Sequence, residues 1–201
     1  MSFFSKHKYL ILIVLSAFLL RIPAYFNDYY DVDELSAIVQ TKQYYSGLTP
    51  GMDFKESKHP LFHALFKVSY GINQDYGWVI LHILVSLIVA LTGAAIYRIT
   101  KEITDKCKTA FVAGILYTVM ICSFNRYFIA TNGEIVYNLP VSIGALSIVL
   151  FLKTDKLFNK IIYLLLLASS SAISAGVKFH GLIISIIAVL FFVFILPYRE
   201  G

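Results

Sequence analysis

Two short clusters of ionisable residues separate the first and second apolar stretches of this 201-residue chain, Asp31-Val32-Asp33-Glu34 and Glu56-Ser57-Lys58-His59. Three carboxylates within four residues suit general-base chemistry, because an ionised carboxylate accepts the proton of an attacking hydroxyl. The second cluster adds a cation and an imidazole just before Pro60, a residue type favoured in the first turn of a helix. A phosphate group held there would meet a positive side chain and free backbone N–H groups.

Both clusters also have a purely structural interpretation. Asp31 is a candidate helix N-cap, and Glu34 completes a capping box three residues later, which leaves Asp33 as the carboxylate without a structural role. Lys58 has the alternative of extending toward lipid headgroups. The patterns alone therefore leave the functional and the structural interpretation open.

A divalent metal ion is the one cofactor that the pattern suggests. Glu34, Glu56 and His59 offer carboxylate and imidazole groups, which are common ligands of such ions. We therefore retain these three residues as candidate metal ligands.

Three further charged residues lie near later apolar stretches. Arg126 and Glu134 bracket a short polar turn, whereas the surroundings of Lys178 are otherwise uncharged. An ionisable group at such a depth in a membrane is costly unless it faces a cavity or a partner. We predict that all three residues bind substrate, with pairing of Arg126 and Glu134 across their turn as the simpler alternative.

The amino-acid composition indicates that the chain is a membrane protein. Hydrophobic residues make up 58% of the chain and charged residues only 14%, with a mean hydropathy of +0.74, which is too apolar for a soluble globular protein of this size. Eleven Gly, five Pro and two Cys give no support to collagen-like, disordered or disulfide-framework proteins. The net charge of +5 arises from short basic clusters between apolar runs, so we expect no nucleic-acid partner.

Six apolar segments are close to the length of about 20 residues that crosses a bilayer as a helix. They lie near residues 9–26, 78–97, 109–124, 135–152, 161–177 and 181–196. The expected fold class is thus an all-α integral membrane protein of about six transmembrane helices.

The long polar segment 28–75 is expected to hold two helices that lie along the membrane surface. One starts near Val32, has Leu35, Ile38, Val39 and Tyr45 near one face, and stops in the turn 46–51. The other starts at Pro60. Function should be sought in this loop, because it contains seven of the twelve acidic residues.

The charge distribution predicts the orientation of the spans. A cytoplasmic N-terminus leaves ten basic and four acidic residues inside, against seven basic and eight acidic residues outside. This is the asymmetry expected of a multi-pass protein of the cytoplasmic membrane, with the loop 28–75 on the extracytoplasmic side. If residues 9–20 were instead a cleaved signal peptide, the loop would still face outward.

Four motifs follow one another in a recognisable order. The first span ends in Arg21, Asp33-Glu34 opens the external loop, and Lys58-His59-Pro60-Leu61 and Thr131-Asn132-Gly133-Glu134 come later. This order resembles the GT-C superfamily of polytopic membrane glycosyltransferases. Its closest likeness is to the branch of protein O-mannosyltransferases and aminoarabinose transferases, glycosyltransferase family 39. That branch has a Lys-Pro-Pro-Leu element, in which this chain has His59 in place of the first Pro.

The resemblance implies an enzyme that transfers a sugar from a polyprenyl-phosphate donor, held among membrane lipids, to an extracytoplasmic glycan, lipid or protein acceptor with inversion. It implies Asp33 as the general base, with Asp31 as the alternative. Glu34 is implied to orient the acceptor or to coordinate a metal ion. The departing phosphate needs positive charge, a role suited to Lys58, Arg126 or Lys178.

Members of that superfamily usually carry more spans and often a soluble C-terminal domain. The resemblance therefore implies that residues 1–201 form one N-terminal module, incomplete at its C-terminus and possessing only part of the donor cavity. Two competing interpretations remain: a small transporter or lipid-handling subunit, in which Glu134 and Lys178 would also be tolerated between spans, and an inactive structural subunit.

Overall fold

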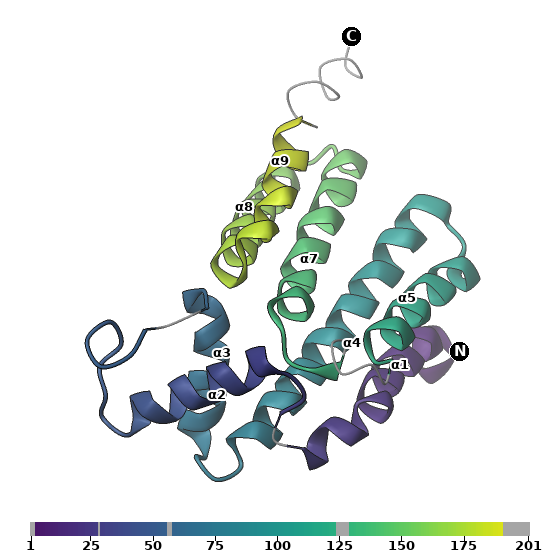
Figure 1. Ribbon diagram of the computed structural model, residues 1–201. Helices are drawn as coiled ribbons and strands as arrows, with labels where there is room; N and C mark the ends of the chain where they lie inside the picture. The colour runs from purple at the N-terminus through teal and green to yellow at the C-terminus, as the bar shows by residue number, and fades with distance from the viewer. Residues whose placement is uncertain (1–2, 28, 56–57, 124–128, 191–201) are drawn as a thin grey trace.

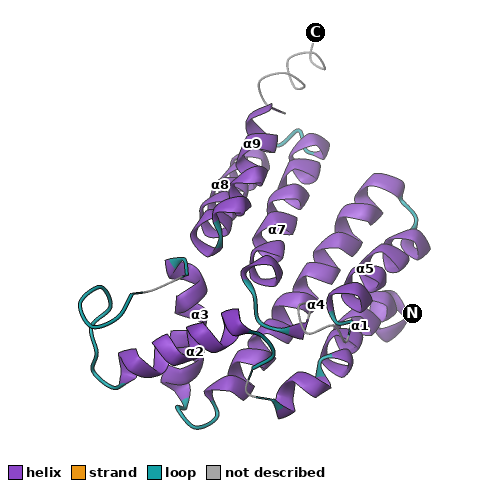
Figure 2. Ribbon diagram, viewed as in Figure 1, coloured by secondary structure: helices purple, strands orange, loops and turns teal. Residues whose placement is uncertain are grey.

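The chain forms a bundle of helices (Figures 1 and 2), and a computed structural model describes residues 3–27, 29–55, 58–123 and 129–190. These residues contain helices and turns but no strand. In chain order the elements are α1 (Phe3–Leu20), η1 (Ile22–Phe26), α2 (Val32–Tyr45), α3 (Pro60–Ile72), α4 (Gly77–Thr104), α5 (Cys107–Ile121), α7 (Gly133–Lys153), α8 (Leu157–Val177), η2 (Phe179–Leu182) and α9 (Ile183–Leu190).

Four segments are long and apolar enough to cross a membrane: His7–Phe26, α4, α7 and α8. The expectation of an all-helical protein with several helices that could span a membrane is thus confirmed, although within the described residues only four helices have the length and apolar character to do so. The third and sixth expected spans coincide with α5, of 15 residues, and α9, of eight. A 15-residue helix rises only ~22 Å, less than the ~30 Å hydrocarbon layer. Of the other residues of those two expected spans, Cys122 and Ser123 follow α5 and Gly181 and Leu182 belong to η2, whereas 124 and 191–196 lie outside the described part of the chain.

The central helix of the bundle is α4, which packs against α1, α3, α5 and α7. The helix ends at Thr104 instead of the expected residue 97, since the charged segment that follows the apolar run is helical as well. Arg98 pairs with Glu102 one turn later at 2.6 Å, and Lys153 at the end of α7 pairs with the same carboxylate at 2.9 Å. Asp105 then ends the helix in the left-handed conformation. These contacts fix α4 to α7 at the end remote from the polar loop.

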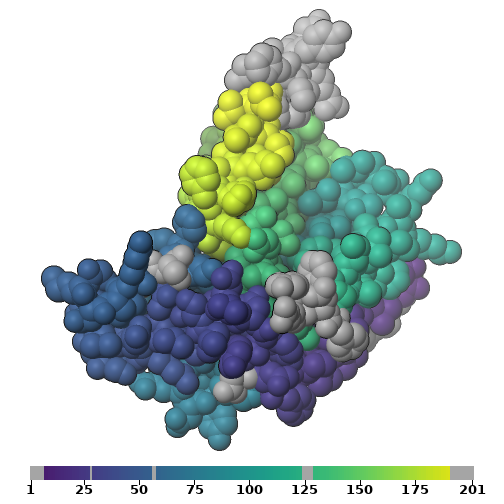
Figure 3. All heavy atoms as spheres, in the orientation of Figure 1, coloured from purple at the N-terminus to yellow at the C-terminus, as the bar shows by residue number. Residues whose placement is uncertain are grey.

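Helices α2 and α3 lie across the other end of the bundle (Figure 1), where their blue segments form a broad shelf in the space-filling view (Figure 3). They begin at Val32 and Pro60, the two starts that the sequence predicts. The Asp31 carboxylate caps α2 by accepting the N–H of Glu34 at 2.7 Å. Asp31 therefore has the capping role that its spacing indicates.

The expected apolar face of α2 was correct at Ile38, which is buried, and at Tyr45, which packs against the core, but not at Val39. Its buried residues are Glu34, Ala37, Ile38 and Thr41, whereas Val39 is 45% exposed. The buried residues follow a spacing of three and four, which marks one helix face, but two of the four are polar. A prediction based on apolar residues alone selects a face rotated from the true one.

The main hydrophobic core lies where the shelf meets the bundle. Ile38 of α2, Phe62 and Phe66 of α3, Val85 of α4 and Ile135 of α7 are among its buried members. The core thus fixes the beginnings of α2, α3 and α7 relative to one another, and these beginnings carry the candidate site residues.

Glycines allow α4 and α5 to approach closely. A Cβ atom on Gly114 would lie 2.8 Å from the backbone oxygen of Gly93 and 2.7 Å from Cδ1 of Ile13. No Cβ is accommodated at such distances, so α1, α4 and α5 meet at a point where only glycine fits.

We predict that Gly114→Ala destabilises the protein by about 1–3 kcal/mol, because the added methyl group overpacks this contact. The measurement is the thermal unfolding midpoint of the detergent-purified protein. Val112→Ala, at a position of α5 that is 58% exposed, serves as the control and should have a smaller effect. An unchanged midpoint for Gly114→Ala would contradict the close approach of α4 and α5.

Candidate functional site

A pocket of about 250 Å³ lies above the core, where α2, α3, α7 and the turn between α8 and η2 meet. Its lining consists of Asp33, Lys58, His59, Phe62, Asn132, Gly133, Glu134, Val177, Lys178, Phe179 and His180. Five of the sequence-predicted site residues are among them: Asp33, Lys58, His59, Glu134 and Lys178. Phe62 and Val177 also belong to the main core, so the pocket rests on a packed floor.

One side of the pocket contains an ion pair between the two clusters of the polar loop. Lys58 Nζ lies 2.6 Å from Asp33 Oδ1. Asp33 occupies the first turn of α2, and Lys58 lies two residues before the start of α3. The Asp33 side chain is 64% exposed and that of Lys58 25%. Asp33 is therefore accessible to a ligand in the pocket.

The other side contains a second ion pair, between Lys178 and Glu134. Glu134 lies in the first turn of α7, whose start is capped by the Asn132 side chain accepting the N–H of Ile135 at 3.0 Å. Lys178 is the residue that ends α8. A Cβ atom on Gly133 would lie 3.2 Å from Cδ of Lys178, so this glycine leaves room for the lysine side chain.

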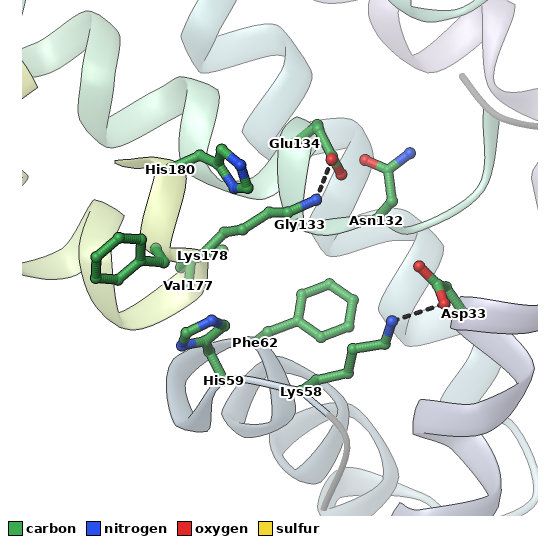
Figure 4. A pocket seen from close by; sticks show the side chains of 11 residues that line it. Asp33, Lys58, His59, Phe62, Asn132, Gly133, Glu134, Val177, Lys178 and His180 are labelled. Atoms are coloured by element: carbon green, nitrogen blue, oxygen red, sulfur yellow. Dashed lines mark hydrogen bonds and ion pairs between the residues drawn. The ribbon is translucent and has the colours of Figure 1, made fainter. Parts of the chain in front are cut away.

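Figure 4 shows that the two lysine side chains extend across the pocket in the same direction, each toward its carboxylate. Asn132 lies between the two carboxylates in this view, and His59 and His180 lie on the opposite side. The pocket thus brings together two anionic and two cationic groups with imidazoles at its edge. Such a set of groups can accept a proton and can bind an anion.

Glu34 faces away from the pocket, although it follows Asp33 directly. Its side chain is fully buried and accepts two backbone hydrogen bonds, from the N–H of Tyr30 and from the N–H of Thr131, both at 2.8 Å. Glu34 is thus not placed to orient an acceptor or to bind a metal ion in the pocket. It instead connects the start of α2 with the segment that leads into α7.

Arg21 adds a second bond to the same segment. This fully buried residue follows α1 and donates from Nη2 to the backbone oxygen of Ile129 at 2.8 Å. Two backbone groups of this segment are therefore fixed by buried side chains. The Arg21 guanidinium binds the carbonyl oxygen of Ile129, and the Glu34 carboxylate binds the N–H of Thr131. Because Thr131 precedes Glu134 by three residues, these bonds position one side of the pocket against the other.

Aromatic and imidazole groups complete the surroundings of Glu34. His82 Nε2 of α4 lies 3.7 Å from Glu34 Oε1, and the His82 ring packs edge-on against Tyr30. The Tyr30 hydroxyl in turn donates to the backbone oxygen of Pro23 at 2.6 Å. Arg21 and His82 were not among the site residues predicted from the sequence. The signal that could have identified them is their position, since each is a polar or charged residue within an apolar segment.

Of the remaining predicted residues, the two that the structure describes, Asp31 and Glu34, do not line the pocket. Asp31 is occupied as the N-cap of α2. Arg126 and Glu56 lie outside the described residues. Among those described, no group of three His, Cys, Asp or Glu side chains is arranged to hold a metal ion. A metal site built from Glu34 and His59 gains no support from this arrangement, because Glu34 is buried and His59 lines the pocket.

Comparisons of the chain with protein-family models, with curated proteins and with solved structures give no match. Any function must therefore be argued from the pocket itself.

Burial raises the pKa of Glu34 above its ordinary value of 4.5, despite the opposing hydrogen bonds from Thr131 and Tyr30. The unfolded chain releases this proton at the ordinary pKa, and the folded chain retains it to higher pH. Between the two pKa values the folded state binds more protons, so the contribution of Glu34 to stability falls as the pH rises.

We therefore predict that the unfolding midpoint of the wild type, measured relative to that of Glu34→Gln, decreases as the pH rises from about 4 to 7. Glutamine has the same size but does not titrate, so the difference isolates this carboxyl group. Thermal unfolding of both proteins in matched buffers tests the prediction. A difference that stays constant or increases with pH would contradict it.

Proposed function

We propose that this chain is a membrane glycosyltransferase of the GT-C type, which transfers a sugar from a polyprenyl-phosphate donor to an acceptor hydroxyl with inversion. The observation that carries this proposal is that one pocket holds the accessible carboxylate Asp33 paired with Lys58, and Glu134 paired with Lys178 on its other side. A carboxylate suits deprotonation of a hydroxyl, and lysines suit an anionic leaving group.

The proposed topology has six spans and a cytoplasmic N-terminus, and it places the pocket at the outer surface of the cytoplasmic membrane. The four long apolar helices and the excess of Lys and Arg on one side support it. Helices α2 and α3 then lie along the outer membrane surface, and α3 has Leu61, Val68 and Ile72 exposed. A donor anchored in the lipid by its polyprenyl chain can reach a pocket at that level.

In the proposed reaction, Asp33 accepts the proton of the acceptor hydroxyl as its oxygen attacks the anomeric carbon of the donor sugar. The new glycosidic bond forms while the bond between that carbon and the phosphate oxygen breaks. The polyprenyl phosphate leaves with the electron pair as an anion, which Lys58 and Lys178 stabilise. Single displacement inverts the anomeric centre.

The acceptor is a glycan, lipid or protein on the same side of the membrane. The transporter alternative makes a different prediction at the same residues. A carrier would move the polyprenyl-phosphate sugar across the bilayer without breaking its phosphate bond, so release of polyprenyl phosphate separates the two functions.

We predict that Asp33→Asn reduces sugar transfer by about 10²- to 10⁴-fold, the usual contribution of a general base. The measurement is the release of polyprenyl phosphate and the labelling of acceptors in membranes that contain the full chain. The donors are radiolabelled undecaprenyl-phosphate mannose, glucose and aminoarabinose.

Asp75→Asn is the matched control, because it removes an exposed acid that does not line the pocket. It should transfer sugar like the wild type. Wild-type turnover by Asp33→Asn would remove Asp33 from the reaction.

We predict that Lys58→Ala weakens binding of the lipid donor, since the lysine supplies positive charge to its phosphate. The apparent donor affinity in the transfer assay should fall several-fold, roughly 1 kcal/mol, as expected for the loss of one partly exposed charged contact. An unchanged donor affinity would exclude Lys58 as a phosphate ligand.

A further inference from the structure

Both lysines of the pocket are already paired with carboxylates of the same pocket. Lys58 contacts Asp33 at 2.6 Å, and Lys178 contacts Glu134. Among the described lining residues these four are the only Lys, Arg, Asp or Glu side chains, so the positive charge of the pocket is compensated throughout. A pocket with two free lysines would attract an anion much more strongly.

A phosphate oxygen and a carboxylate oxygen compete for the same ammonium hydrogens, because both are anionic acceptors. If a phosphate shared the lysine with the carboxylate, two negative charges would be brought close together, which is unfavourable in a partly buried site. A bound phosphate must therefore break or loosen the Asp33–Lys58 and Glu134–Lys178 pairs.

The positions of the carboxylates favour their remaining ionised after such an exchange. Asp33 lies in the first turn of α2 and Glu134 in the first turn of α7. The N-terminal end of a helix carries partial positive charge and stabilises an anion there. Each carboxylate thus has a second source of stabilisation that does not depend on its lysine.

We propose that Asp33 and Glu134 act as internal competitors of the phosphate group, each holding one lysine until a prenyl phosphate displaces it. This inference rests on the proposed function, because it takes the phosphate of the lipid donor or product to be the ligand. It assigns Glu134 a role other than contact with the substrate: Glu134 limits the affinity of the pocket for phosphate.

The competition has a consequence for the order of events. Binding of the donor phosphate to Lys58 frees the oxygen of Asp33 that the lysine had occupied, and Asp33 then accepts the proton from the acceptor hydroxyl. After transfer, Asp33 loses this proton to water and pairs with Lys58 again. Re-formation of both ion pairs favours departure of the polyprenyl phosphate.

The test measures phosphate binding in the absence of turnover. Isothermal titration calorimetry with farnesyl phosphate is performed on the full chain purified in a neutral detergent. We expect Asp33→Asn and Glu134→Gln each to bind farnesyl phosphate roughly two- to fivefold more tightly than the wild type, which corresponds to the strength of a partly exposed ion pair. Lys58→Ala and Lys178→Ala should bind it more weakly.

Three controls identify the source of the effect. Asp75→Asn changes the net charge equally outside the pocket and should leave the affinity unchanged. Farnesol lacks the phosphate, so its binding should not respond to any of these substitutions. Inorganic phosphate should show the same ranking of variants if the phosphate group alone is recognised, and no measurable binding if the prenyl chain is required.

Unchanged or weaker farnesyl phosphate binding in both Asp33→Asn and Glu134→Gln would overturn the competition. If Asp33→Asn nevertheless lost sugar transfer, the proposed glycosyltransferase function would stand without the competition. Conversely, if both variants bound farnesyl phosphate more tightly and the wild-type chain transferred no sugar, the competition would be supported and the glycosyltransferase function would be contradicted. The two acids lie on different helices, so misfolding of one variant leaves the other as a test.

Discussion

The arrangement of the site depends on one carboxylate that has no access to water. Burying an ionisable group without partners costs several kcal/mol, and Glu34 offsets this cost with two backbone N–H donors. One donor, Tyr30, precedes α2, and the other, Thr131, is 97 positions away and precedes α7. The group that no ligand can reach therefore holds in place the two helix starts that carry the accessible acids Asp33 and Glu134.

Those parts of the fold that follow from local signals could be predicted from the sequence. The apolar runs indicate the four long spans, and an acidic N-cap and a proline mark the starts of α2 and α3. The end of α4 could not be placed by hydropathy, because the ion pair of Arg98 with Glu102 extends the helix beyond its apolar part. The buried face of α2 was only partly predicted, since half of its buried residues are polar and one of them, Glu34, has a partner 97 positions away.

The candidate site was predictable in its members but not in their partners. Asp33 and Lys58 stand out as members of two clusters of ionisable residues, and Glu134 and Lys178 as charged residues next to apolar stretches. Their pairing depends on how α2, α3, α7 and α8 pack, which one sequence does not display. The different roles of Asp33 and Glu34 illustrate the difficulty: neighbours on a helix point in directions about 100° apart, so one side chain is 64% exposed and the other is buried.

The bond between Thr131 and Glu34 also constrains how the protein is made. The ribosome delivers the chain from its N-terminus, so α2 and its buried carboxylate leave the exit tunnel long before their partner is synthesised. Until then Glu34 has only its local donors, and the pocket has neither Glu134 nor Lys178. The site is consequently assembled late in biogenesis.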